Sequence, residues 1–577
     1  MRIDGKSEGP RQSMSWLHTW ASLILGWLLY AIFVTGTLSF FQNEISVWMK
    51  PELHQSVPSQ SQIEQTQVAL NYLQTHHPDA GSWGIQLPNS RQNTTQITVR
   101  GAGEDPRERR GGQRITIDSA TGEVLEARQT RGGGFLYRFH FELYGLDRSW
   151  ARWIVGIATM LMFVAIISGI ITHKKIFTDF FTFRPGKGQR SWLDAHNATA
   201  VFALPFHLMI TFSGLLLLLF TLMPWGVERI YENRGKFLQE QRAALVEAPA
   251  SERPSREGNA APEAQARGAT APAENRAERA EGESGRGEGR RGREQVQPAA
   301  LADLAPIIAN AQQQWGSNPI ANITISAPNT SKAKIELRAL HGESVAHRNI
   351  YQSLSFNGVT GLENPDDGSK LKNPTIPAAI YNVTTTLHEA RGVDLSLRWL
   401  LFLSGILGTL MVATGLLLWC VKRAPQQQKQ GYKSFGYRTV EVLNVTAIIG
   451  LPIACAAFFY ANRFIPADLS ARSNLEIRAF FITWALVFVY ALIRQHRQAW
   501  LEMLALATVM FAGLPLLNFM TGGQALWNTI AHGQWMIASF DLAMWVLALL
   551  FGFSWVKVKN HKGLATKKAK ATPTQED

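Results

Sequence analysis

Cysteine is nearly absent from this chain of 577 residues, which contains only Cys420 and Cys455. Both lie in long apolar segments, so the sequence offers neither a disulfide framework nor a cysteine-ligated metal or iron–sulfur site. A glycine-rich dinucleotide fingerprint after a strand is also missing. The loops that carry most of the basic residues are too short to hold a flavin or nicotinamide domain. The sequence therefore excludes both a disulfide-stapled module and a built-in flavin or nicotinamide domain.

Acidic residues are fewer than basic ones, 44 against 57, which gives a formal net charge of +13. The excess is concentrated in loops and ends that fall on one side of the predicted membrane, and short cytoplasmic loops are enriched in Lys and Arg. We therefore expect a cytoplasmic location for both termini, and we see no nucleic-acid footprint. The basic clusters are Arg2–Arg11, His173–Arg190, Lys422–Arg423, Arg494–Arg497 and Lys557–Lys570.

Long apolar runs dominate the sequence, and crossing a bilayer takes roughly 20 such residues per helix. Eight windows qualify, about 16–40, 150–172, 197–223, 396–421, 439–461, 476–493, 499–519 and 534–556. The first run is too long for a signal peptide and is followed by no small-residue cleavage site, so we interpret it as a retained helix. The predicted fold class is mainly α, a polytopic membrane helical bundle of about eight transmembrane helices.

Two polar regions separate the early helices and are expected to be periplasmic. Each has the pattern of a small α+β module, with one amphipathic helix and alternating strands. The predicted helices are 61–76 and 301–315, and the predicted strands are 83–87, 96–100, 114–118, 123–127, 321–326, 333–339 and 352–356. Residues 247–297 consist almost wholly of Ala, Glu, Arg, Gly and Pro, which predicts disorder.

These features give a division into eight segments. The boundaries are 1–41 (N-terminus and first helix), 42–148 (first module), 149–224 (second and third helices), 225–300 (disordered insert), 301–395 (second module), 396–438 (fourth helix and loop), 439–556 (last four helices) and 557–577 (basic tail).

The first four predicted helices form an internal repeat. His18 stands eighteen residues before Gly36, and His196 stands eighteen before Gly214. Arg152-Trp153 and Arg398-Trp399 precede Gly169 and Gly415 by equal intervals, with His140 and His388 upstream. The module patterns repeat as well, so residues 15–172 and 191–421 form two related halves. The last four helices have no counterpart.

Histidines paired by this repeat are candidate ligands for haem iron, because an iron porphyrin in a helical bundle takes imidazoles from facing helices. We predict that His18 pairs with His196 near the cytoplasmic surface and that His140 pairs with His388 near the periplasmic surface. His207 lies eleven residues after His196, roughly 16 Å along a straight helix on nearly the same face. Two ligands so spaced suit two stacked haem groups, so His207 either replaces a member of the outer pair or serves a deeper haem.

Three further groups keep two interpretations each. His173 competes with His18 as a ligand or is an interfacial histidine. Arg152 and Arg398 pair with haem propionates or contact lipid headgroups. The repeated glycines permit close helix packing, which we favour, or leave room for a flat macrocycle. They are Gly26, Gly36, Gly156, Gly169, Gly214, Gly405, Gly408 and Gly415.

Several of these motifs together resemble the PepSY-associated transmembrane-helix proteins, which include bacterial inner-membrane ferric-siderophore reductases. The similarity covers about residues 14–422. It rests on the Thr/Ser-Gly helix ends, on the Leu-His and Arg-Trp entries to the second and fourth helices, and on the Asp118–Val124 hairpin. The resemblance implies a four-helix haem-binding core that carries electrons to periplasmic substrates such as iron(III)–siderophore complexes.

The predicted function is thus that of a haem-dependent ferric-siderophore reductase, an oxidoreductase with two b-type haem groups. Its expected partners are membrane lipid, the ferric siderophore, and a separate cytoplasmic reductase or quinol as electron donor. Two alternatives remain. The first is a non-catalytic protein whose PepSY modules bind or regulate a periplasmic peptidase or envelope partner. The second is transport through the last four helices, with Asp541 as the coupling group.

Overall fold

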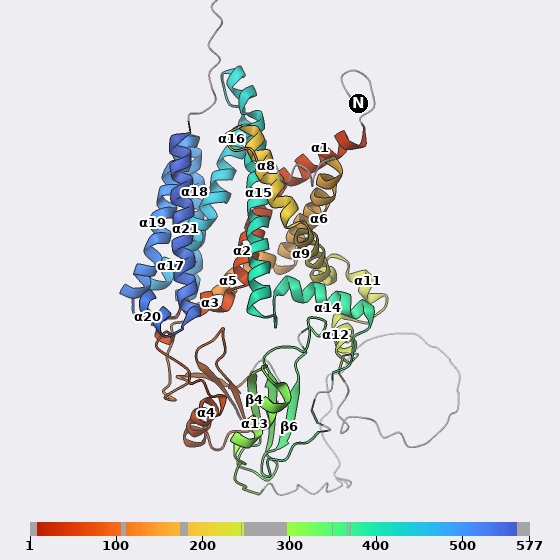
Figure 1. Cartoon of the computed structure of the whole chain (residues 1–577), viewed down its shortest axis with the longest axis vertical. Helices are drawn as coiled ribbons and strands as arrows, with labels where there is room; N and C mark the ends of the chain where they lie inside the picture. Colours follow the sequence, from red (N-terminus) through yellow and green to blue (C-terminus); the bar gives the residue numbers. More distant parts are fainter. Residues whose placement is uncertain are drawn as a thin grey trace, which may run out of the picture.

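The computed structural model describes residues 9–104, 111–173, 183–243, 245–246, 297–348, 350–365, 367–368 and 371–561. The predicted disordered stretch 247–297, except for its last residue, and most of the basic tail lie outside the described residues. Figure 1 shows an elongated helical bundle with a β-sheet unit below one end of it. We call this the sheet end of the bundle and the opposite end the far end.

Six described segments are long and apolar enough to cross a membrane. They are α6 (Arg148–Thr172), α15 (Leu395–Gln430), Phe435–Phe464, α18 (Arg472–Ile493), α19 (His496–Met520) and α21 (Trp535–Asn560). The third consists of α16 (Phe435–Asn444), the π-helical η3 (Val445–Ile449) and α17 (Gly450–Phe464). This is a multi-pass membrane protein.

Two further spans are bent rather than continuous. α1 (Pro10–Ile24) and α2 (Gly26–Ser39) meet at 65°, and α8 (Gln189–Phe202) and α9 (Leu204–Leu217) meet at 67°. The expectation of one straight helix in each of the windows 16–40 and 197–223 is therefore wrong. Sharp bends occur at Gly or Pro, and Gly26 and Pro205 follow the two breaks. Leu25 and Ala203, at the breaks, are separated by the same interval as His18 and His196, so the bend belongs to the repeat.

Several helices outside the long apolar runs were not predicted. α5 (Gly133–Glu142) precedes α6, and α14 (Ile376–Glu389) precedes α15. The other short elements are α3 (Gln42–Trp48), η1 (Pro51–Leu53), α10 (Leu219–Leu222), α11 (Pro224–Glu228), α12 (Arg234–Ala243) and α20 (Leu526–Ala531). α11 and α12 occupy the start of the range 225–300, so the prediction of disorder is wrong for those residues.

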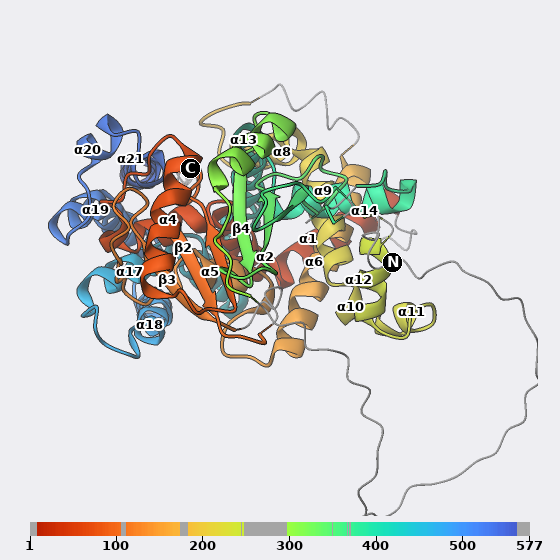
Figure 2. The same ribbon diagram turned by 90° about the horizontal axis from the view of Figure 1, so that it is seen from below.

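The two α+β modules share one antiparallel sheet with the strand order β3-β2-β1-β4-β5-β6. The strands are β1 (Ser82–Gln86), β2 (Thr95–Arg100), β3 (Gln113–Ile117), β4 (Ile320–Ser326), β5 (Lys334–Ala339) and β6 (Ser353–Asn357). The module helices α4 (Gln62–His76) and α13 (Leu304–Trp315) pack with the buried faces of the strands in one hydrophobic core, and Figure 2 shows the two helices beside the sheet. Three strands and one helix bury little apolar surface alone, and joining β1 to β4 completes a shared core.

The predicted strand 123–127 is wrong. Only Val124 pairs with the sheet, through an isolated bridge to Ile117. Gly122 adopts φ +79°, which turns the chain after β3, and the following residues run on toward α5. Sequence alternation alone did not reveal that the turn ends the pairing after one residue.

The last four spans pack against the first half of the repeat. Trp27 Nε1 on α2 donates to Asn444 Oδ1 at 2.8 Å, and the Tyr30 hydroxyl donates to the Ile448 carbonyl at 3.0 Å. Ile448 lies in the π-helical turn, and Trp484 on α18 donates to the carbonyl of Thr446 in the same turn. The π-helical turn thus accepts side-chain hydrogen bonds from both α2 and α18.

Near the sheet end, six buried or half-buried charged residues join the last four spans to the first half of the repeat. We call these residues the junction cluster. They are Glu52, Arg128, Arg463, Arg472, Glu476 and Asp541. The Arg472–Glu476 pair is closed at 3.0 Å with neither side chain exposed, and Arg472 also donates to the Gln129 carbonyl at 2.9 Å. Three positive and three negative charges balance, which makes burial of such groups in a membrane protein tolerable.

Asp541 is held within this cluster by neutral donors. Trp48 Nε1 donates to one carboxylate oxygen at 2.8 Å and Asn518 Nδ2 to the other at 3.1 Å. The Arg463 guanidinium lies 4.4 Å from the centre of the Trp48 ring and donates to Asn518 Oδ1 at 2.7 Å. This carboxylate therefore connects α3, α17, α19 and α21, which is the arrangement of a structural group and weakens its candidacy as a transport coupling group.

Replacing Arg472 by Met should lower the free energy of unfolding by about 3 kcal/mol or more, because Glu476 would keep a buried charge without its partner. The measurement is thermal unfolding of the purified protein in detergent. Arg494→Gln is the control, since the Arg494–Glu502 pair is solvent-exposed and its loss should cost less than about 1 kcal/mol. Equal losses in the two variants would contradict a structural role for the junction cluster.

The shared sheet predicts a cross-link between its two modules. Gly84 on β1 faces Thr324 on β4, so cysteines at both positions should form a disulfide on oxidation, seen as a mobility shift in a non-reducing gel. Glu336 faces Thr324 from β5, so the pair Gly84→Cys and Glu336→Cys lies two strand spacings apart, about 9–10 Å, and should not cross-link. Cross-linking of the second pair alone would contradict the strand order.

Candidate functional site

Four histidines form two pairs within the first four spans, and both pairs join the two halves of the repeat. His18 on α1 faces His196 on α8 with ring centres 6.2 Å apart, toward the far end. His18 Nδ1 donates to the Ala165 carbonyl on α6 at 2.8 Å, and His196 Nδ1 donates to the Met411 carbonyl on α15 at 2.9 Å. Each ring is therefore fixed to a helix of its own half and faces a ring of the other half.

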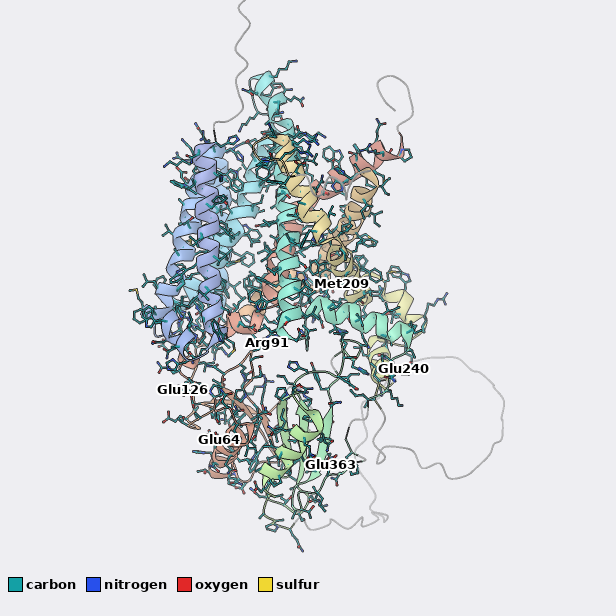
Figure 3. The ribbon with its side chains drawn as sticks, viewed as in Figure 1. Glu64, Arg91, Glu126, Met209, Glu240 and Glu363 are labelled. Carbon is teal, nitrogen blue, oxygen red and sulfur yellow. The ribbon has the colours of Figure 1, made fainter. Side chains whose placement is uncertain are left out.

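The second pair lies at the sheet end. His140 on α5 faces His388 on α14 with ring centres 6.0 Å apart. His140 Nδ1 donates to the Ile32 carbonyl on α2 at 2.8 Å. His388 Nδ1 lies 2.8 Å from the Ser213 hydroxyl on α9, which itself donates to the Met209 carbonyl and so accepts from the imidazole. Figure 3 labels Met209 on α9 beside α14, whose last turn carries His388, and Figure 1 shows α1 and α8 toward the far end and α5 and α14 toward the sheet.

A glycine accompanies each of these histidines. The His rings come closest to the space where a Cβ would stand at Gly169 and Gly415 (3.2 Å each), Gly214 (3.3 Å) and Gly36 (2.7 Å). In three cases the carbonyl that accepts the Nδ1 hydrogen lies four residues before the glycine. A side chain at that position would cover the preceding helical turn, so only glycine leaves the carbonyl open to an imidazole. These four glycines therefore do more than allow close helix packing, because they also make room for the histidine rings.

The geometry of the pairs fits one metal ion held between two imidazoles. With metal–nitrogen bonds of about 2 Å, imidazoles on opposite sides of one ion have ring centres roughly 6 Å apart. Nδ1 is occupied by a backbone or hydroxyl acceptor in all four rings, as is usual for ligating histidines, and Nε2 remains for the ion. Burial lowers the pKa of His140 and lowers that of His388 to about 3, so these rings are neutral and keep a lone pair on Nε2.

Among the described residues there is no group of three or more His, Cys, Asp or Glu side chains that could hold a metal ion. The candidate ligands of this chain come in pairs. Two imidazoles on opposite faces are the ligand set of a six-coordinate haem, so the pairs fit an iron porphyrin better than a tetrahedral metal site.

His207 does not join either pair. It lies after the bend between α8 and α9, so the expectation that His196 and His207 stand roughly 16 Å apart along one straight helix is wrong. The side chain is fully buried, and neither ring nitrogen has a hydrogen-bond partner among the described residues. Its Nε2 lies 3.3 Å from the place of a Cβ at Gly408, and the Phe33 ring is 6.4 Å away. Its counterpart in the first half is Leu29, so this polar position is unique to the second half.

The remaining sequence candidates have protein partners. His173 Nε2 lies 3.1 Å from the Asn197 amide nitrogen at the far end. Arg152 pairs with Glu142 at 2.8 Å, and Arg398 approaches Glu44 at 3.6 Å. Glu44 also binds Arg91 at 2.9 Å, and Figure 3 places Arg91 at the junction between the bundle and the sheet unit. Through Glu44, Arg398 contributes to the attachment of the sheet unit.

The sequence did not reveal the groups that fix the histidines. Ala165, Met411 and Ile32 act through backbone carbonyls, which leave no mark in composition. The equal eighteen-residue intervals between histidine and glycine were a visible signal. The histidine and the glycine that define each interval do not contact each other. Each glycine instead contacts a histidine from a different helix of the same half.

Comparison with protein families gives one match. Residues 15–422, more than half of the chain, match the family described as PepSY-associated TM region. The matched range begins before α1's histidine and ends within α15, so it contains both histidine pairs and the whole sheet, while the last four spans lie beyond it. None of the curated proteins compared with the chain matches it.

Gly36→Ala should displace His140, because the new Cβ would lie 2.7 Å from two atoms of its ring. If each pair holds one haem, the haem bound per protein should fall roughly by half, with the far-end pair unaffected. The measurement is haem content of the purified protein. Gly134→Ala on α5 is the control, since nothing lies within 4 Å of its added Cβ. Equal haem content in the two variants would contradict the role of Gly36.

Proposed function

From the premise that this chain belongs to the PepSY-associated TM family, we propose that it is a haem-containing electron-transfer protein of the bacterial inner membrane. Its acceptor is a periplasmic compound, and we propose iron(III) bound by a siderophore, which is reduced to iron(II) for iron uptake. The electron donor is a separate cytoplasmic reductase or membrane quinol.

One observation carries the proposal. Two histidine pairs, one toward each end of the bundle, have ring separations of 6.2 and 6.0 Å, and all four Nδ1 atoms are engaged by acceptors on neighbouring helices. One ligand pair could be a chance contact. The duplicated scaffold contains two equivalent pairs, and each of the four histidines contacts its own glycine. This repetition favours a cofactor-binding role over a chance contact.

A haem held by each pair supplies reversible one-electron chemistry. The protein's part is to hold the imidazoles and to keep water away. Apolar residues between the two levels, among them Leu29, Ile32 and Met411, form a buried cluster in the same four helices. A low-dielectric lining of this kind, together with the hydrogen bonds at Nδ1, influences the reduction potential of a bound haem.

The distribution of charge supports the direction of transfer. The described basic residues Lys422, Arg423, Arg494, Arg497 and Lys557 lie at the ends of α15, α18, α19 and α21 that are remote from the sheet (Figure 1). By the positive-inside rule the far end is cytoplasmic and the sheet periplasmic. Addition of one electron to oxygen-ligated iron(III) gives iron(II), which binds hard oxygen ligands less tightly, so the iron can leave its chelator.

The test is a reduced-minus-oxidised absorption spectrum of the purified protein. We expect a b-type haem signal with about two haem groups per chain, and roughly half of it should be lost in His196→Ala and in His388→Ala. His532→Ala is the matched control, because this exposed histidine bonds only its own helix, through the Asn528 carbonyl. A spectrum without haem, or one that neither ligand variant alters, would refute the proposal.

A haem-free protein would favour the alternative of a non-catalytic membrane protein that binds a periplasmic partner through its sheet unit. In that case the four histidines would serve helix packing alone. Their replacement would then lower the thermal stability of the protein without any change in visible absorption.

A further inference from the structure

A small hollow lies at the sheet end, beside the helix that carries His388. It is enclosed by the loop after β5, by the end of α14 and by the turn that leads into α15, and its interior has a volume of about 10 Å³, with one side open. Its lining residues include Ser344, Arg348, Tyr351, Thr386 and Arg391. A cavity needs roughly 10–15 Å³ to hold one water molecule, so this hollow has room for about one oxygen atom of a larger molecule, whose remainder stays outside.

Positive charge exceeds negative charge around the hollow. Arg348 makes two hydrogen bonds to Glu389, at 2.9 and 3.3 Å, so these two charges cancel. The exposed Arg391 donates to the Tyr137 hydroxyl at 2.9 Å and stacks on the same ring at 5.5 Å. No acidic side chain forms an ion pair with Arg391 among the described residues. Its guanidinium thus offers a planar set of hydrogen-bond donors beside the Arg348–Glu389 ion pair, which has no net charge.

A buried hydroxyl without a partner lines the same hollow. Thr384 and Thr385 donate to the carbonyls of Ile380 and Tyr381, one helical turn earlier. Thr386 is 5% exposed, and its hydroxyl has no hydrogen-bond partner among the described residues. An unpaired buried hydroxyl destabilises a protein unless a ligand or water completes it. Together with Arg391, it matches an acceptor-only group.

We propose that this hollow binds one carboxylate of a soluble ligand on the sheet side of the protein, through Arg391 and Thr386. Charge-assisted hydrogen bonds from a guanidinium fit a carboxylate closely. Thr386 stands two residues before His388, and Tyr137, the partner of Arg391, stands three before His140. The carboxylate therefore binds between the two helices of the sheet-end pair.

The binding site stands on its own geometry, whereas its role rests on the proposed function. If electrons leave at the sheet-end pair, a carboxylate-bearing iron chelate docks here as the acceptor. The ligand class is then an anionic carboxylate chelate rather than a cationic or neutral one. The bulk of such a ligand would lie outside the hollow, against the exposed loop residues Ser344 and Val345.

Citrate is the probe, titrated by calorimetry into the full chain in lipid nanodiscs. We expect saturable binding that weakens roughly tenfold or more in Arg391→Gln and in Thr386→Val, since each loses a hydrogen bond to a charged group. Thr386→Val should leave the melting temperature of the ligand-free protein unchanged or raised. Arg114→Gln, on the exposed outer strand β3 at the other edge of the sheet, removes the same charge and should bind citrate like the wild type.

Two further measurements are needed. One distinguishes a soluble carboxylate from a haem propionate, and the other tests the proposed function separately from the carboxylate site. Binding is repeated in His140→Ala/His388→Ala, which should lack the sheet-end haem. Equal citrate affinity in both forms supports a soluble ligand, whereas binding only in the double variant assigns the hollow to a haem propionate and overturns the inference. No citrate binding, or equal affinity in wild type, Arg391→Gln and Thr386→Val, also overturns it. The haem spectrum is recorded on the same samples and tests the proposed function independently.

Discussion

The site depends on one steric constraint. An imidazole can donate to a carbonyl in the middle of a helix only where the side chain one turn later is absent, because that side chain would cover the acceptor. The first four spans meet this condition for His18, His140 and His196, whereas His388 donates to the Ser213 hydroxyl beside Gly214. A single added methyl group at Gly36 would collide with the ring of His140. Everything proposed about cofactor binding follows from rings that are fixed through Nδ1 in this way, so that Nε2 is the nitrogen left for a ligand.

The duplicated scaffold is symmetric in its histidine pairs and asymmetric in its surroundings. The last four spans pack on α2, α3 and α5 of the first half, through contacts such as Trp27 to Asn444 and through the junction cluster. The second half carries instead the hollow beside α14 and the buried His207, whose ring nitrogens have no hydrogen-bond partner in the described part of the chain. The added spans thus pack directly against α5, the helix that carries His140.

The sheet unit contributes by position. Joining the two modules through β1 and β4 makes one rigid body, and Glu44 on α3 connects it to the bundle by binding Arg91 and approaching Arg398. Because both modules belong to the same sheet, the chain segments that lead to α5 and to α14 both begin at strands of that sheet. The two histidines of the sheet-end pair are thereby brought together by the periplasm-facing fold proposed above as much as by the helices.

The sequence alone determined the membrane character, the internal repeat, six of the seven expected strands and the pairing of His18 with His196 and of His140 with His388, because hydropathy, alternation and equal spacing are local properties. Only the tertiary structure decided the bends at Leu25 and Ala203, the single shared sheet and the separation of His207 from both pairs. These features depend on which helix meets which, and on backbone carbonyls, and neither is written in side-chain composition. A helix bend changes the direction of a side chain without changing its spacing in the chain.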